Sequence, residues 1–69
     1  MTPASLRALI ERLGISQIET ARLIGVDPST IRRYLSGRLT VPEPTTRLLY
    51  AIEDIPGMRE YLRLGTRYT

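Results

Sequence analysis

The first part of the chain carries apolar residues with the spacing of one helix face. Four of them lie at positions i, i+3, i+4 and i+7, namely Leu6, Leu9, Ile10 and Leu13. Thr2 is a suitable N-cap, Pro3 suits the first turn, and Gly14 favours a helix end. The pattern therefore predicts a helix over residues 2–13.

Two shorter segments follow with helical periodicity. Residues 16–24 begin with a serine and carry a glutamate three positions later, which is the pattern of a capping box. The inward face expected for this helix consists of Ile18, Ala21 and Ile24, with Leu23 beside them. Residues 28–36 predict a third helix, because Asp27 is a good N-cap and Pro28 suits the first helical position. Its expected inward residues are Ile31, Tyr34 and Leu35.

The sequence also predicts helices in the C-terminal third of the chain. Residues 38–44 contain two prolines and predict a loop. Residues 45–55 predict a fourth helix with the apolar stripe Leu48, Leu49, Ile52 and Ile55. A Pro-Gly pair then breaks the pattern, and residues 58–64 predict a short last helix. The chain shows no alternation typical of strands, so we expect an all-α fold in a single domain over residues 1–69.

The composition excludes several kinds of site. The 69 residues include no Cys and no His, which rules out disulfides and removes the usual zinc ligands. No acidic cluster suits calcium, and the sequence offers no nucleophile–base pair and no phosphate-cradling loop. We therefore expect neither enzyme activity nor a metal, cofactor or small-molecule ligand.

Arginine carries all of the positive side-chain charge. Ten Arg and no Lys stand against seven acidic residues, which gives a net charge of +3. The guanidinium fork suits phosphates and guanine edges, and a modest net charge favours one localised basic face. No segment is long enough to span a membrane, and the N-terminal helix carries charges that a signal peptide would lack. We therefore expect a cytoplasmic protein.

The segment from Ser16 to Arg38 resembles the helix-turn-helix of the Cro and phage-repressor superfamily. The residues that carry the resemblance are Gln17, Ala21, Gly25, Val26, Ile31 and the closing Leu-Ser-Gly-Arg run. Physical reasons agree, because a small side chain lets two helices cross closely and glycine adopts a left-handed turn at low cost. With the flanking helices, the resemblance implies a five-helix, lambda-repressor-like DNA-binding domain with its motif at residues 16–38.

In that family the second motif helix enters the major groove. The resemblance implies contacts to double-stranded DNA by Gln17, Ser29, Thr30, Arg32, Arg33 and Arg38. Gln17 and Arg38 are expected to contact phosphates, which fix position but carry little sequence information. Ser29 and Thr30 lie in the first turn of the helix, where relatives reach base edges.

Two adjacent arginines and a proline bear on specificity. Arg33 is expected at a base or a phosphate, and Arg32 at a base, at a phosphate or in solvent. Pro28 stands where some relatives carry a base-reading amide, and its side chain offers no hydrogen-bond donor. This departure prevents the transfer of any relative's operator sequence to this chain.

These features favour a transcriptional repressor that occludes a promoter. A phage repressor, an antitoxin-like autoregulator and a regulator of an anti-CRISPR-type operon all fit the sequence. The alternative is a protein-interaction module that uses the same fold without DNA. An acidic outer face would favour that alternative, and the Arg32–Arg33 pair argues against it.

Apolar residues near the C-terminus predict a homodimer. A domain this small buries little surface, and a second copy is the remaining means of stabilising it. One recognition helix reads too few base pairs to be selective, so we expect an inverted-repeat operator with half-sites about 34 Å apart. Leu48 and Ile52 are expected to cover the motif helices, and the expected interface comprises Ile55, Met58, Tyr61 and Leu62. The alternative is that the last helix folds back on its own domain as a lid.

Overall fold

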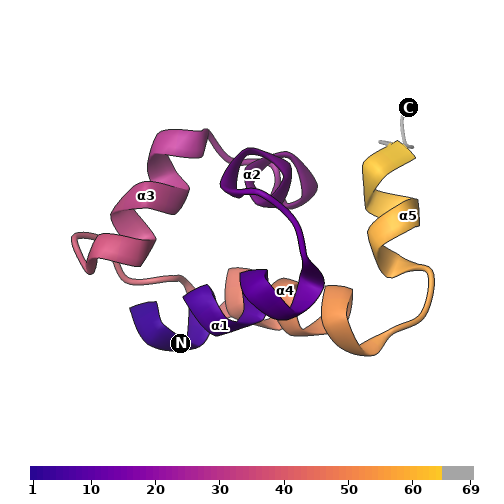
Figure 1. Ribbon diagram of the computed structural model, residues 1–69, viewed down its shortest axis with the longest axis horizontal. Coiled ribbons are helices and arrows are strands. Elements are labelled where there is room, and N and C mark those ends of the chain that lie inside the picture. Colours follow the sequence, from indigo (N-terminus) through magenta and orange to yellow (C-terminus); the bar gives the residue numbers. More distant parts are fainter. Residues whose placement is uncertain (65–69) are drawn as a thin grey trace.

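The computed structural model describes residues 1–64, and within that range it contains five helices and no strand (Figure 1). The helices are α1 (Pro3–Leu13), α2 (Gln17–Ile24), α3 (Pro28–Ser36), α4 (Glu43–Asp54) and α5 (Met58–Leu64). The all-α fold class with five helices, predicted from the periodicity and the resemblance, is confirmed.

Side-chain caps fix the starts of the first three helices. Oxygen atoms of Thr2, Ser16 and Asp27 accept hydrogen bonds from backbone N–H groups two or three positions later, at 2.8–3.0 Å. The capping box expected at α2 is only half formed, because the Glu19 carboxylate lies 3.4 Å from the Arg22 guanidinium instead of returning to the helix start. The predicted helix starts are therefore correct to within one residue for these three elements.

The turn of the motif depends on Gly25. This residue has φ 75°, in the left-handed region, and it joins the end of α2 to Val26 and Asp27, the two residues that precede α3. A side chain would strain the backbone here, although nothing lies within 4 Å of the position that a Cβ would occupy. Backbone conformation, and not lack of space, therefore requires glycine at this turn.

The core lies where α1, α2, α3 and α4 meet. Leu6, Leu9, Ile31 and Leu49 are its largest fully buried apolar side chains. Ala21 is 1% exposed and belongs to the same cluster, and α2 packs chiefly against α3. The predicted role of Ala21 as the small residue inside the motif agrees with this burial.

One predicted core residue is wrong. Ile18 was expected to face inward, yet it is 57% exposed. Thr20, Ala21 and Leu23 form the buried face of α2 instead, and Ile18 lies about 140° around the helix from the middle of that face. Burial of Thr20 is possible because its hydroxyl donates a 2.8 Å hydrogen bond to the Ser16 carbonyl.

Helix α4 begins earlier than the sequence suggested. It runs from Glu43 to Asp54 instead of over residues 45–55, because Pro44 fits the first turn of a helix. Ile52 is buried as expected, whereas Leu48 is only half-buried and Leu49 takes the fully buried position.

The loop before α4 also contributes to the core. Val41 is 6% exposed, although it lies in the segment 38–44 that the sequence predicted only as a loop. The sequence shows no periodicity in this short segment, so its burial depends on the surrounding helices.

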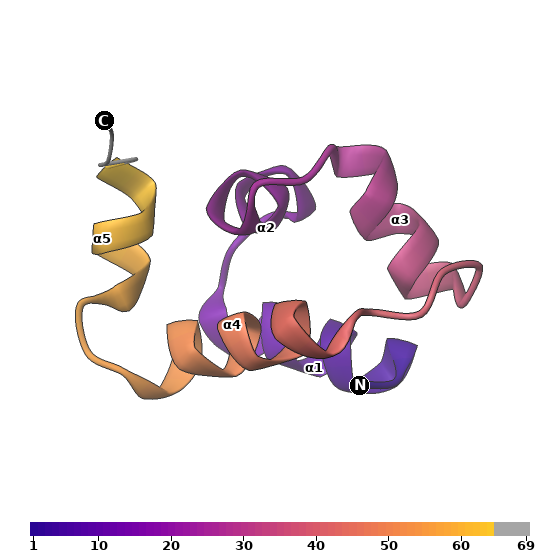
Figure 2. The same cartoon turned by 180° about the vertical axis from the view of Figure 1, so that it is seen from behind.

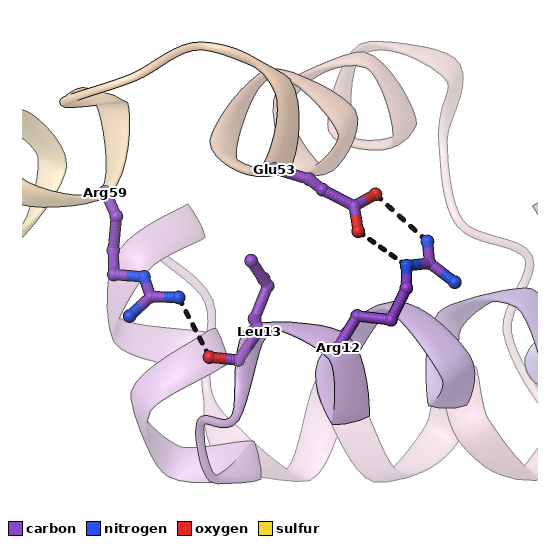
Figure 3. Close-up of polar contacts among 4 residues, drawn as sticks. All are labelled: Arg12, Leu13, Glu53 and Arg59. Carbon is purple, nitrogen blue, oxygen red and sulfur yellow. Dashed lines mark hydrogen bonds and ion pairs between the residues drawn. The ribbon is translucent and has the colours of Figure 1, made fainter.

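Hydrogen bonds of two arginines connect the end of α1 to the C-terminal helices (Figure 3). Arg12 forms two hydrogen bonds with the Glu53 carboxylate of α4, at 2.5 and 3.0 Å. Arg59 of α5 donates a 2.8 Å hydrogen bond to the Leu13 carbonyl at the last turn of α1. Helix α5 also packs against α2 and α4, so it lies against its own domain, as the lid alternative expected.

Helix α3 and the last helix lie at opposite ends of the molecule. The longest dimension is 33 Å, with α3 at one end of it and α5 at the other, and both views agree on this arrangement (Figures 1 and 2). The outer face of α3 is therefore remote from α5.

Candidate nucleic-acid interface

The outer face of α3 forms a basic hollow. Ile31, Tyr34 and Leu35 anchor the opposite face of this helix in the core. The residues that line the open hollow come from α3 and the residues just after it: Ser29, Arg32, Arg33, Ser36 and Arg38. Four of these five were predicted from the sequence, and Ser36 was not. We name these five residues the basic hollow.

Thr30 lies outside the basic hollow. It is half-buried, and about 100° around α3 from Ser29, so it points to the side of the helix. Its predicted role at a base edge stays a prediction, and of the two first-turn residues only Ser29 lines the basic hollow.

The arginines of the basic hollow are unpaired. Within residues 1–64, the guanidinium groups of Arg7, Arg32, Arg33 and Arg38 form no ion pair or hydrogen bond, while every other arginine side chain there has a partner. Three of the four unpaired guanidinium groups therefore lie in one hollow. Such groups are available for an anionic or hydrogen-bond-accepting ligand.

Gln17 lies in a second hollow, between α1 and the start of α2. Its lining includes Arg7, Glu11 and Ser16, together with apolar residues of the core edge. Gln17 is exposed at the first position of α2, where backbone N–H groups attract an anion. The fourth unpaired arginine, Arg7, therefore accompanies the predicted phosphate contact. Sequence reasoning missed Arg7, because nothing in the helical pattern distinguishes it from Arg12.

Asp27 is the acidic residue nearest to the basic hollow along the chain, and it serves as a cap. A hydrogen bond from the Ser29 backbone N–H, 2.8 Å from its carboxylate, is the main cause that lowers the pKa of Asp27. The Ser29 side chain and the positive charges of Arg32 and Arg33 lower this pKa further. The carboxylate is therefore ionised at neutral pH and already engaged with the start of α3.

The predicted interface residues lie near the turn between α4 and α5. Ile55 and Tyr61 are about half exposed, at 48% and 51%, while Met58 and Leu62 are half-buried. Ile55, Met58 and Tyr61 line a shallow apolar groove with Pro56 and Gly57, and Leu62 does not line it. The structure thus brings together three of the four residues on one surface.

The described residues offer little for other chemistry. Within residues 1–64 no three acidic side chains gather into a group that could hold a metal ion. No helix in this range is long and apolar enough to cross a membrane.

Comparison with known proteins gives one finding. A helix-turn-helix family model of the Cro/C1 type matches residues 6–61, which include all of α1 except its first turn, the motif, α4 and the start of α5. No curated protein and no solved structure matches the chain. Because the family match covers most of the chain, the protein belongs to the Cro/C1-type helix-turn-helix family of DNA-binding domains.

Proposed function

We propose that this protein is a sequence-specific repressor of transcription in a bacterium or a phage, acting in the cytoplasm on double-stranded DNA. The observation that carries this proposal is the basic hollow on α3, whose three arginines have no partner within residues 1–64. A helix in the major groove would direct these side chains toward base edges and flanking phosphates. Binding over a promoter would then exclude the polymerase.

Phosphate contacts would set the register of the domain on the duplex. Gln17 and Arg7 share one hollow at the start of α2, and Arg38 follows α3. Their separation on both sides of the recognition helix suits contacts to the backbones that flank a groove. In this proposal Arg7, Gln17 and Arg38 position the protein, while Ser29, Arg32 and Arg33 contribute sequence preference.

The operator would be an inverted repeat bound by a homodimer. The apolar groove at Ile55, Met58 and Tyr61 is a surface for the second copy, with half-buried Leu62 on the same short helix. The groove lies beside α5, at the end of the molecule remote from α3 (Figure 2), so a second copy bound there would leave the outer face of α3 uncovered. The proposal expects the half-sites of the operator to lie one DNA turn, about 34 Å, apart.

Regulation of the protein's own operon is the simplest arrangement for such a repressor. The concentration of the protein would then set the occupancy of its operator, which gives autoregulation.

The test is selection of bound sequences from a pool of random duplexes. The proposal expects enrichment of one inverted repeat with a fixed half-site spacing. A pool that stays random after several rounds, with no retention on DNA, would leave only the alternative, a protein-interaction module. That alternative lacks a specific observation in its favour, because the outer face of α3 carries arginines and hydroxyls but no carboxylate.

A further inference from the structure

The side chains on the outer face of α3 have an ordered arrangement. At about 100° per residue, Ser29 and Ser36 lie within about 20° of each other on the helix. Arg33 lies about 40° to one side of Ser29, and Arg32 lies about 60° to the other. On α3 itself, the basic hollow therefore has a central line of two small hydroxyl side chains with one arginine on each flank, and Arg38 follows just after the helix.

Small side chains on the central line let the helix approach the floor of a groove closely. Each flanking guanidinium is on an exposed residue and has no hydrogen bond or ion pair within residues 1–64. No intramolecular contact must break before Arg32 or Arg33 reaches a base. The two side chains diverge, so they reach different base pairs.

The chemistry of this face matches one base. Guanine presents two acceptors in the major groove, N7 and O6, which a guanidinium fork can bind together. Adenine is read by an amide that both donates and accepts, and cytosine by a carboxylate. Helix α3 carries no amide and no carboxylate, and the adjacent Asp27 is engaged in its cap.

We propose that each half-site contains two guanines, one bound by Arg32 and the other by Arg33, and no adenine read through an amide contact. This inference rests on the DNA binding proposed above and specifies the sequence that it recognises. It does not depend on the dimer, because it concerns a single α3 helix.

The test replaces each guanine of the selected duplex, one at a time, with 7-deazaguanine, which pairs normally but lacks the N7 acceptor. We expect replacement at two positions in each half-site to weaken binding of the unaltered protein about 5-fold or more. Arg33→Ala should be insensitive to replacement at one of them, and Arg32→Ala at the other. Arg63→Ala is the matched charge control, because Arg63 pairs with Glu60 on α5, far from α3.

A change of specificity gives a second, independent readout. Glutamine binds adenine through N6 and N7, so Arg33→Gln in a repeated selection should replace one guanine of the half-site by adenine. A half-site without guanine, or one with fewer than two N7-sensitive positions, would overturn the inference and leave DNA binding intact. Failure to enrich any sequence would instead defeat the proposed function itself.

Discussion

The role of each arginine depends on what already holds its guanidinium. Arg12 is held by Glu53 and Arg59 by the Leu13 carbonyl, so these two side chains connect helices (Figure 3). Arg33 has no such contact within residues 1–64 and stands in the basic hollow. Replacing Arg12 or Arg59 removes a contact between helices, whereas replacing Arg33 changes only what the domain can bind.

Arg33→Ala is predicted to weaken binding to the selected operator by about 1–3 kcal/mol, with little effect on shuffled DNA. The reason is that a bidentate contact to a base discriminates among sequences. Competition binding of both duplexes measures the difference. An equal loss on operator and shuffled DNA would make Arg33 a phosphate contact.

Gln17→Ala is predicted to weaken binding to all sequences by nearly the same factor, because contacts to phosphate carry little sequence information. Arg7→Ala should behave in the same way, since Arg7 lines the same hollow. The readout is the ratio of operator to shuffled affinity, which should not change in either variant. A drop in that ratio would mean that these side chains also affect base recognition.

Sequence alone predicted the caps and the closing glycine of α2, because these depend on neighbours within a few residues. The sequence could not show that, within residues 1–64, the guanidinium of Arg12 has a partner and that of Arg7 has none. The partner of Arg12 is 41 positions away, and only the packing of α1 against α4 brings it close. Which arginines stay available for a ligand is therefore a property of the folded chain.

At the level of elements, the motif depends on close packing of α2 on α3. Periodicity predicted both helices but placed Ile18 in the core, because an isoleucine is usually buried. The packing instead selects Thr20, whose hydroxyl is satisfied within its own helix. Thr20, a polar residue with a local hydrogen bond, is thus buried, whereas hydrophobicity alone predicts the burial of Ile18.

Ala21→Leu is predicted to destabilise the domain by about 1–3 kcal/mol, because overpacking a tight contact forces helices apart. In a domain of this size that corresponds to a fall in Tm of roughly 4–20 °C. Thermal unfolding followed by circular dichroism measures it. Ala4→Leu, at an exposed position of α1, is the matched control and should change Tm little. An unchanged Tm in Ala21→Leu would contradict the packing described for Ala21.

At the level of the whole molecule, the two ends differ in their surface chemistry. Helix α3 presents the basic hollow at one end, and the apolar groove lies beside α5 at the other. The sequence left two alternatives for the last helix: an interface with a second copy, or a lid folded back on its own domain. The fold shows the contact of α5 with its own domain that the lid alternative expected, since Arg59 donates a hydrogen bond to the Leu13 carbonyl of α1. Ile55 and Tyr61 stay about half exposed, and the interface that they were expected to form stays a prediction.

Ile55→Glu is predicted to shift the protein toward monomer, because a carboxylate in the apolar groove must be desolvated when a second copy covers it. Sedimentation at several concentrations measures the change. Leu39→Glu is the matched control, since Leu39 is exposed to a similar degree, 43%, and lies outside the groove. If the two variants sediment identically at every concentration, the apolar groove is not the dimer interface.

The most direct test of the central claim compares two duplexes at physiological salt. One carries the selected inverted repeat, and the other has the same base composition in shuffled order. Specific recognition by this domain predicts that the inverted repeat binds about a thousandfold more tightly. Equal affinity for the two duplexes would contradict sequence-specific recognition, and with it the proposed repressor function.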